Sequence, residues 1–149
     1  MSELTEPVAA RTPEQATEEL VALALAARQR AYAPYSNFLV GAALRTDDGR
    51  VFSGANVENA SYGLSVCAER SAIATAVSAG ARKLVELVVA THSAPPVAPC
   101  GICRQMIAEF AHDLPIVLVN DRGERRHTSL AALLPMAFGS DDLESRRAE

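Results

Sequence analysis

The stretch LVELVVATHSAPPVAPCGICRQMIAEFAHDLPIVLVN, residues 84–120, decides the fold of this chain. Residues 84–91 are largely apolar and precede a Pro-rich loop, which is typical of a strand buried inside a sheet. A helix is expected to open at Cys100 and to continue to about His112, and residues 115–120 form a second apolar strand. A strand, a helix and a strand in succession place the two strands parallel. The stretch therefore predicts an α/β fold.

The rest of the chain adds a helix, a hairpin and shorter elements. Thr12-Pro13-Glu14-Gln15 joins a capping threonine to a proline at the first helical position, which predicts a helix that Pro34 stops near Ala33. The complete order predicts a three-layer α/β/α sandwich with a mixed sheet of about five strands. Residues 1–149 are expected to form a single domain, with 1–11 as a loose N-terminal tail. The other expected elements are strands 38–45 and 51–56, a loop over 57–66, a helix from near Cys67 to Gly80, an edge strand at 125–128, and a brief helix capped by Thr128 or Ser129 that ends before Pro135.

Composition and charge exclude several classes of partner. The 149 residues carry a net charge of −4, whereas nucleic-acid binding rests on clustered Lys and Arg, so no nucleic-acid partner is expected. The basic cluster Arg122, Arg125 and Arg126 is interpreted as a solvated hairpin turn. The apolar run 21–27 follows acidic residues and is too short to span a bilayer, so no membrane partner is expected and a cytoplasmic location is the default. The hydrophobic share of 49% suggests that some apolar surface is buried between subunits.

All three cysteines lie in two short segments, Cys67-Ala68-Glu69-Arg70 and Pro99-Cys100-Gly101-Ile102-Cys103. A structural zinc site normally has four protein ligands, whereas a catalytic site has three and keeps the fourth position for water or substrate. Cys67, Cys100 and Cys103 therefore predict an open zinc site. A redox pair or plain core thiols are the alternatives, but neither gives a role to Cys67 together with Glu69. An odd number of cysteines argues against a disulfide framework.

Glu69 is the expected catalytic residue. Both cysteine segments are expected at helix N-termini, where free N–H groups and the helix dipole favour thiolate over thiol. Two residues beyond Cys67, the Glu69 carboxylate can lie beside the metal without binding it. Such a carboxylate would take a proton from the attacking water, give it to a ring nitrogen of the substrate and help to protonate the departing amine. Arg70 and Arg104 are candidates to hydrogen-bond the sulfurs, with surface ion pairs as the alternative.

A set of segments carries a resemblance to a known family. They are Tyr32-Ala33-Pro34-Tyr35-Ser36, Phe38-Leu39-Val40-Gly41-Ala42-Ala43, Asn56-Val57-Glu58-Asn59-Ala60, the two cysteine segments extended to Gln105, and Leu133-Leu134-Pro135-Met136-Ala137-Phe138-Gly139. In this order they resemble the small homotetrameric zinc-dependent cytidine deaminases, from about residue 17 to 143. The resemblance implies a cytidine deaminase-like fold, one Zn²⁺ per subunit and shared active sites in a homotetramer. It implies hydrolytic deamination of cytidine and 2′-deoxycytidine to uridine and 2′-deoxyuridine, with release of ammonia, in pyrimidine salvage.

The same resemblance assigns the residues that bind the free pyrimidine nucleoside. It implies that Asn56 and Glu58 hydrogen-bond the ribose hydroxyls, that Phe38 and Ala68 line the nucleoside pocket, and that Phe138 reaches the pocket of a neighbouring subunit. A carboxylate and an amide suit a neutral sugar better than a phosphate. The alternatives are that Asn56 and Glu58 cap a turn and that Phe138 anchors the C-terminal segment in the core.

Two other functions remain open at the level of sequence. A blasticidin-type aminonucleoside deaminase shares the fold and the zinc motif, but it resembles the segment from Asn56 to Tyr62 poorly. A non-catalytic zinc or redox protein would use the same cysteines to hold structure or to exchange electrons. A closed metal site, or a reversible disulfide between Cys100 and Cys103, would favour this last interpretation.

Overall fold

The computed structural model describes residues 10–144, so residues 1–9 of the predicted loose tail lie outside the described part. One mixed sheet runs through the centre in the order β2-β1-β3-β4-β5. Strands β3 and β4 are parallel, and the other neighbouring pairs are antiparallel. The elements are α1 (Pro13–Arg28), β1 (Gly41–Thr46), β2 (Val51–Ala55), η1 (Tyr62–Leu64), α2 (Ala68–Ser78), β3 (Leu84–Thr91), α3 (Gly101–Phe110), β4 (Pro115–Asn120), β5 (Arg125–Ser129), α4 (Leu130–Leu133) and α5 (Ser140–Glu144).

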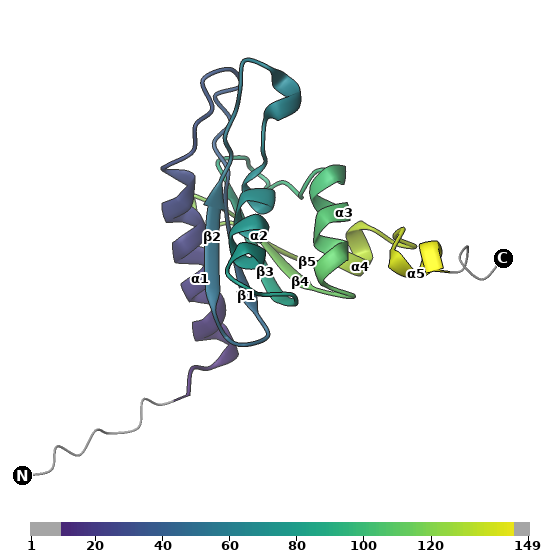
Figure 1. Ribbon diagram of the computed structural model, residues 1–149. Coiled ribbons are helices and arrows are strands. Elements are labelled where there is room, and N and C mark those ends of the chain that lie inside the picture. Colours follow the sequence, from purple (N-terminus) through teal and green to yellow (C-terminus); the bar gives the residue numbers. More distant parts are fainter. Residues whose placement is uncertain (1–9, 145–149) are drawn as a thin grey trace, which may run out of the picture.

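Helices cover both faces of the sheet, as Figure 1 shows. Alternate residues of a strand point to opposite faces, and the core divides in this way. In β3, Val88 packs with α1, whereas Leu87 and Val89 pack with α2 and α3. In β1, Ala43 lies on the α1 side and Leu44 on the other. The predicted three-layer α/β/α sandwich with a five-stranded mixed sheet is confirmed.

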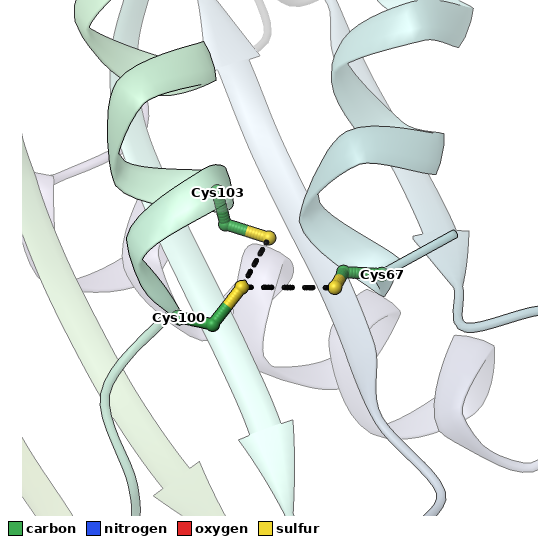
Figure 2. A group of neighbouring side chains, drawn as sticks. All are labelled: Cys67, Cys100 and Cys103. Atoms are coloured by element: carbon green, nitrogen blue, oxygen red, sulfur yellow. Dashed lines mark hydrogen bonds between the residues drawn. The ribbon is translucent and has the colours of Figure 1, made fainter. Parts of the chain in front are cut away.

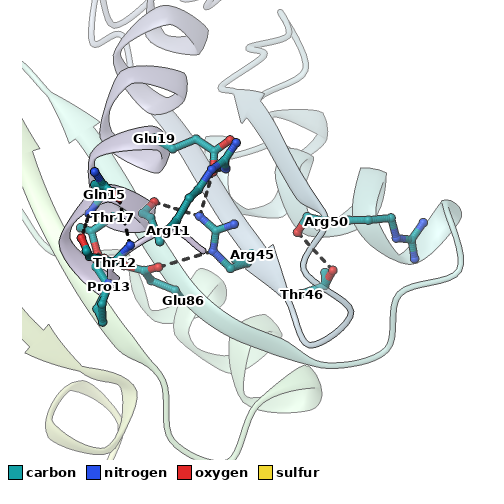
Figure 3. Close-up of polar contacts among 11 residues, drawn as sticks. Arg11, Thr12, Pro13, Gln15, Thr17, Glu19, Arg45, Thr46, Arg50 and Glu86 are labelled. Carbon is teal, nitrogen blue, oxygen red and sulfur yellow. Dashed lines mark hydrogen bonds and ion pairs between the residues drawn. The ribbon is translucent and has the colours of Figure 1, made fainter. Parts of the chain in front are cut away.

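Polar contacts hold α1 against the sheet (Figure 3). Thr12 forms the predicted capping box with Gln15, since each side chain bonds the backbone N–H of the other. Arg45 of β1 donates to Glu19 at 3.1 Å, and its Nε lies 3.9 Å from a carboxylate oxygen of Glu86 in β3. Arg45 is largely shielded from solvent, and this ion cluster links α1 to β1 and β3.

Two predicted boundaries are wrong, for the same reason. The first helix ends at Arg28 instead of near Ala33, because Tyr32 pairs with the segment that follows β2: its N–H donates to the carbonyl of Asn56 at 3.0 Å. Strand β1 begins at Gly41 instead of residue 38, because the Asn56 side chain bonds the backbone of Phe38 and Val40 in place of a strand partner. The end of α1 and the start of β1 are therefore both set by hydrogen bonds to Asn56, which is distant in sequence.

The remaining boundaries lie close to the prediction. Helix α3 stops at Phe110, two residues before His112, where Ala111 adopts an extended conformation. Ser129 caps α4 by accepting a hydrogen bond from the N–H of Ala132 at 3.2 Å. Residues 56–67, which carry η1, extend beyond one end of the sheet (Figure 1). Within residues 10–144, no helix is long and apolar enough to cross a membrane.

At Gly41 the backbones of α1 and β1 approach closely. A Cβ added there would lie 1.9 Å from the carbonyl oxygen of Ala24 and 2.5 Å from the backbone nitrogen of Arg28. We expect Gly41→Ala to lower the free energy of unfolding by about 2–3 kcal/mol, the upper part of the usual range for overpacking a core, because the clash is with backbone atoms. Gly63→Ala is the matched control, because a Cβ there meets nothing within 4 Å. Urea unfolding of both variants tests this, and equal midpoints would contradict it.

Candidate active site

The three cysteines converge between the first turns of α2 and α3 (Figure 2). Cys67 is the N-cap of α2, Cys100 is the N-cap of α3, and Cys103 lies in the first turn of α3. The Sγ atoms of Cys67 and Cys100 are 3.8 Å apart, and those of Cys100 and Cys103 are 3.5 Å apart. All three thiols are free, and within residues 10–144 they form the one cluster of its kind with the spacing of a metal site.

These sulfur distances fit zinc. With Zn–S bonds of about 2.3 Å, tetrahedral geometry separates two sulfurs by about 3.8 Å. All three Sγ atoms lie within 4.8 Å of one another, so one ion can contact them together after small side-chain shifts. Three thiols leave one of the four tetrahedral positions to another ligand, which is the arrangement of a catalytic zinc site.

The pKa values of the cysteine thiols are also consistent with a bound cation. Hydrogen bonding with the Cys103 thiol, ahead of the effects of Cys100 and Arg70, lowers the pKa of Cys67 to about 6. At Cys103, contact with Cys67, followed by burial, raises the pKa of the thiol. One thiolate in the cluster therefore disfavours a second, and a bound cation would offset this repulsion. Arg70 lies near enough to contribute to the lowered pKa of Cys67, and its role at a zinc site stays a prediction.

Glu69 is almost completely buried, with 4% of its surface exposed. Burial, followed by the negative charge of Cys67, raises the pKa of the Glu69 carboxyl above its ordinary value. A carboxyl group in this state exchanges a proton at a pH closer to neutrality than an exposed glutamate does. Glu69 lies beside Cys67 and Cys103, and its role as a proton carrier stays a prediction.

Glu69 and two of the cysteines open into a cavity of about 290 Å³. Cys67 and Cys100 line this cavity together with Glu69, whereas Cys103 is completely buried behind them. The volume is at the lower end for small-molecule sites, and apolar walls with a few polar groups are typical of such sites. The other lining residues are Ser36, Phe38, Val40, Asn56, Glu58, Ala68, Val89, Thr91, Val97 and Ala98.

Asn56 and Glu58 line the cavity, but each side chain also forms hydrogen bonds with backbone groups of the segment at residues 35–40. The Asn56 amide accepts from the N–H of Val40 at 2.8 Å and donates to the carbonyl of Phe38 at 2.7 Å. The Glu58 carboxylate accepts from the N–H groups of Tyr35 and Ser36 at 2.9 and 3.2 Å. The turn-capping alternative therefore fits Glu58, which holds the turn at residues 34–36, whereas Asn56 bonds the extended segment at residues 38–40. The contact of both residues with a ribose stays a prediction.

The hydrogen bonds that Glu58 accepts from Tyr35 and Ser36 also favour its ionised form. Its hydrogen bond from the Ser36 hydroxyl, followed by those from the two backbone N–H groups, lowers the pKa of the Glu58 carboxyl. A negative charge therefore stands in the wall of the cavity that Cys67 and Cys100 also line. Such a charge favours a hydroxyl donor and repels an anionic group.

Phe138 does not line this cavity. Its side chain is 54% exposed, and its carbonyl accepts a hydrogen bond from Gln105 of α3 at 2.8 Å. It borders a separate hollow of about 520 Å³ together with residues of α3, α4 and α5. The alternative of a core aromatic is wrong, and the contact of Phe138 with a neighbouring subunit stays a prediction.

Arg104 has partners different from the sulfurs that the sequence suggested. Its guanidinium donates to the carbonyls of Pro99 at 2.7 Å and Leu133 at 2.8 Å. It thereby fixes the backbone immediately before Cys100 and connects α3 to the end of α4. The observed contacts support an indirect effect on the metal site through the position of Cys100.

The sequence did not identify the wall formed by the Pro-rich loop. Val97 and Ala98 line the cavity from this loop, and Ser36 lines it from the segment before Phe38. The signal for Val97 and Ala98 was their place in the loop shortly before Cys100, since the loops that lead into such helices border the site. Ser36 carried no comparable local signal, because its role depends on Glu58, which is 22 residues away.

Comparison with known proteins decides the family. Residues 14–119 match the family described as the cytidine and deoxycytidylate deaminase zinc-binding region. The chain belongs to this family. Among cytidine and deoxycytidylate deaminases, the chain is similar to the cytidine deaminase of Sporosarcina psychrophila, with 47% identity over 127 residues that cover 85% of this chain and 93% of that protein.

Members of the deaminase family with solved structures have the same fold. The crystal structure of cytidine deaminase from Burkholderia pseudomallei matches with a TM-score of 0.78 and 52% identity, covering 81% of this chain and 98% of that chain. The blasticidin-S deaminase of Bacillus cereus is more distant, with 35% identity over 107 residues that cover 66% of this chain and 76% of that protein.

Proposed function

We propose that this protein is a cytidine deaminase, which hydrolyses cytidine and 2′-deoxycytidine to uridine and 2′-deoxyuridine and releases ammonia. The observation that carries the proposal is the buried Glu69 carboxyl beside three clustered thiols, opening into one cavity. The relatives named cytidine deaminase, at up to 47% identity over most of the chain, support the choice of substrate. The active unit in this proposal is a single domain.

The proposal gives each subunit one Zn²⁺, held by Cys67, Cys100 and Cys103. When bound there, zinc supplies Lewis acidity that makes water a usable nucleophile near neutral pH. Arg70 offsets part of the negative charge of Cys67. Arg104 holds the carbonyl of Pro99 and thereby the approach of the chain to Cys100.

Glu69 moves the protons of the reaction. Water adds to C4 of the pyrimidine, and the carboxylate takes a proton from that water and gives it to the ring nitrogen N3. The C4–N bond then breaks, and the amino group leaves as ammonia after a further protonation that Glu69 assists. Cytidine and water thus give uridine and ammonia without any other reactant. The raised pKa of Glu69 suits it to both uptake and release of a proton.

Glu58 and Asn56 bind the sugar in this proposal, with Phe38 and Ala68 beside the base. The negative Glu58 accepts from a ribose hydroxyl and disfavours a nucleotide, whose phosphate is also negative. The net charge of −4 gives no attraction to a polynucleotide. A free pyrimidine nucleoside is therefore the proposed substrate.

Glu58→Ala is expected to raise the KM for cytidine by about tenfold or more, because a hydrogen bond to a charged group is worth about 1.5–3 kcal/mol. Glu14→Ala is the matched control, because it removes an exposed carboxylate from the first turn of α1, and Glu14 does not line the cavity. Its KM should change by less than about threefold. Steady-state kinetics test this. Equal KM values for the wild type and Glu58→Ala would contradict the sugar contact.

We further propose a homotetramer in which Phe138 completes the active site of a neighbouring subunit. The position of Phe138 outside its own cavity and its exposed ring support this arrangement. Exposed apolar side chains on the segments around the cavity, such as Tyr35, Tyr62 and Leu64, are suited to burial between subunits. Sedimentation velocity measures the number of subunits.

A mixing experiment tests the shared site. Phe138→Ala should lower kcat/KM about tenfold or more, and Glu69→Gln should be nearly inactive. Subunits of the two variants, co-expressed and purified as mixed oligomers, should regain activity at low cytidine concentration, because some sites combine an intact Glu69 with an intact Phe138. The control is a mixture in which the Glu69→Gln subunit also carries Phe138→Ala. Equal activity of both mixtures would contradict the shared site.

The free thiols support a reducing compartment, and we propose a cytoplasmic enzyme of pyrimidine salvage. A blasticidin-type deaminase is the second candidate, supported by the similarity to the blasticidin-S deaminase of Bacillus cereus. Parallel assays with cytidine, cytidine 5′-monophosphate and blasticidin S separate the substrates. The proposal expects the highest kcat/KM for cytidine, and a higher value for either of the other two would overturn it.

A further inference from the structure

The ring of Phe38 forms part of the cavity wall, but the backbone alone does not fix it. Asn56 holds the carbonyl of Phe38 and the N–H of Val40, and the Ser36 hydroxyl accepts from the N–H of Phe38 at 3.0 Å. These bonds determine where the Cα of Phe38 lies. The side chain is only half-buried, so its ring needs a neighbour to restrict its rotation about χ1 and χ2.

His92 is that neighbour. Its imidazole packs on the ring of Phe38 with centroids 5.3 Å apart and an angle of 59° between the planes. His92 directly follows β3 and is exposed, and it is not among the residues that line the cavity. The imidazole therefore contacts a ring that lines the cavity, although His92 does not line the cavity itself.

Hydrogen bonds at Ser93 hold the backbone next to His92 in place. The Thr91 hydroxyl accepts from the N–H of Ser93 at 3.3 Å, and Asn120 of β4 donates to the carbonyl of Ser93 at 3.0 Å. Thr91 and Asn120 are both buried, with 1% of their surface exposed. An exposed aromatic side chain is thus presented from a well-fixed stretch of backbone, which is the condition for it to position another ring.

We propose that His92 is a positioning residue for substrate binding, which holds the ring of Phe38 in the orientation that contacts the pyrimidine. This inference rests on the proposed function. An aromatic pair of this kind is worth about 0.5–1.5 kcal/mol beyond the area that it buries. Loss of the His92 ring therefore affects the binding of the nucleoside and leaves the proton transfers at Glu69 unchanged.

The test is the kinetics of cytidine deamination by His92→Ala, His92→Phe and the control His127→Ala, whose side chain lies exposed on β5. His92→Ala should raise KM about 2- to 10-fold with kcat changed by less than a factor of two. His92→Phe, which keeps an aromatic ring, should restore KM to within about twofold of the wild type. His127→Ala should match the wild type. Zinc content and melting temperature verify that each variant is folded and loaded.

A double-mutant cycle with Phe38→Leu shows whether His92 acts through Phe38. In the Phe38→Leu background, His92→Ala should cause no further rise in KM. An unchanged KM for His92→Ala, no restoration by His92→Phe, or the same rise in both backgrounds would overturn the inference alone. A zinc-loaded wild type that leaves cytidine unchanged would overturn the proposed function and this inference with it.

Discussion

Glu69→Gln is expected to lower kcat for cytidine at least about a thousandfold while zinc content and melting temperature stay close to those of the wild type. General acid–base catalysis contributes about 10²- to 10⁴-fold, and here one carboxyl group serves both proton transfers. Glutamine has the same size and can occupy the buried position, but it cannot take up or release a proton. The loss should therefore appear in kcat and not in the fold.

The control for Glu69→Gln is Glu14→Gln, the same change in the exposed first turn of α1. It should leave kcat unchanged. The measurements are the rate of uridine formation at saturating cytidine, zinc content by mass spectrometry and thermal unfolding. If Glu69→Gln kept more than about a tenth of the wild-type kcat, Glu69 would not be the proton carrier.

The second large effect is expected at Cys67. Cys67→Ala removes one of three thiols from a cluster that lies within 4.8 Å, so zinc content should fall from about one per chain to nearly zero, together with all turnover. Cys67→His is the matched variant, because imidazole is also a zinc ligand and should retain zinc in part. Arg70→Ala keeps every thiol and should only speed the loss of zinc to a chelator.

Zinc content after dialysis, and the rate of zinc release to a chelator, rank these Cys67 and Arg70 variants. The expected order of retention is wild type, Arg70→Ala, Cys67→His and then Cys67→Ala. Full zinc retention by Cys67→Ala would show that Cys67 is not a ligand. Identical release rates for the wild type and Arg70→Ala would remove the role of Arg70 at the sulfur.

The central strands were predictable because their signal is local. Strands β3 and β4 have the predicted bounds, since a continuous apolar run is enough to mark a strand that is covered on both faces. The end of α1 was not predictable in this way. It depends on the pairing of Tyr32 with Asn56, and no pattern within either segment shows that the two segments meet.

The residues of the candidate site likewise fall into two groups, those with a local signal in the sequence and those whose contacts lie far away in the sequence. The metal cluster follows from residue type and from two helix starts, so Cys67, Cys100 and Cys103 could be grouped from the sequence alone. The present contacts of Asn56 and Glu58 could not be predicted, because each bonds backbone groups 16 to 23 residues away. The role of Arg126 was also missed, because its partner lies 30 residues away. Arg126 donates to the carbonyl of Pro96 and thereby joins β5 to the Pro-rich loop.

The most direct test of the proposed function is a stoichiometric assay of the purified, zinc-loaded protein with cytidine, in which uridine and ammonia are both measured. Rapid conversion is expected, with one ammonia released per uridine formed, and this activity should be lost when a chelator removes the zinc. A folded protein with one zinc per chain that leaves cytidine unchanged would contradict the proposed function.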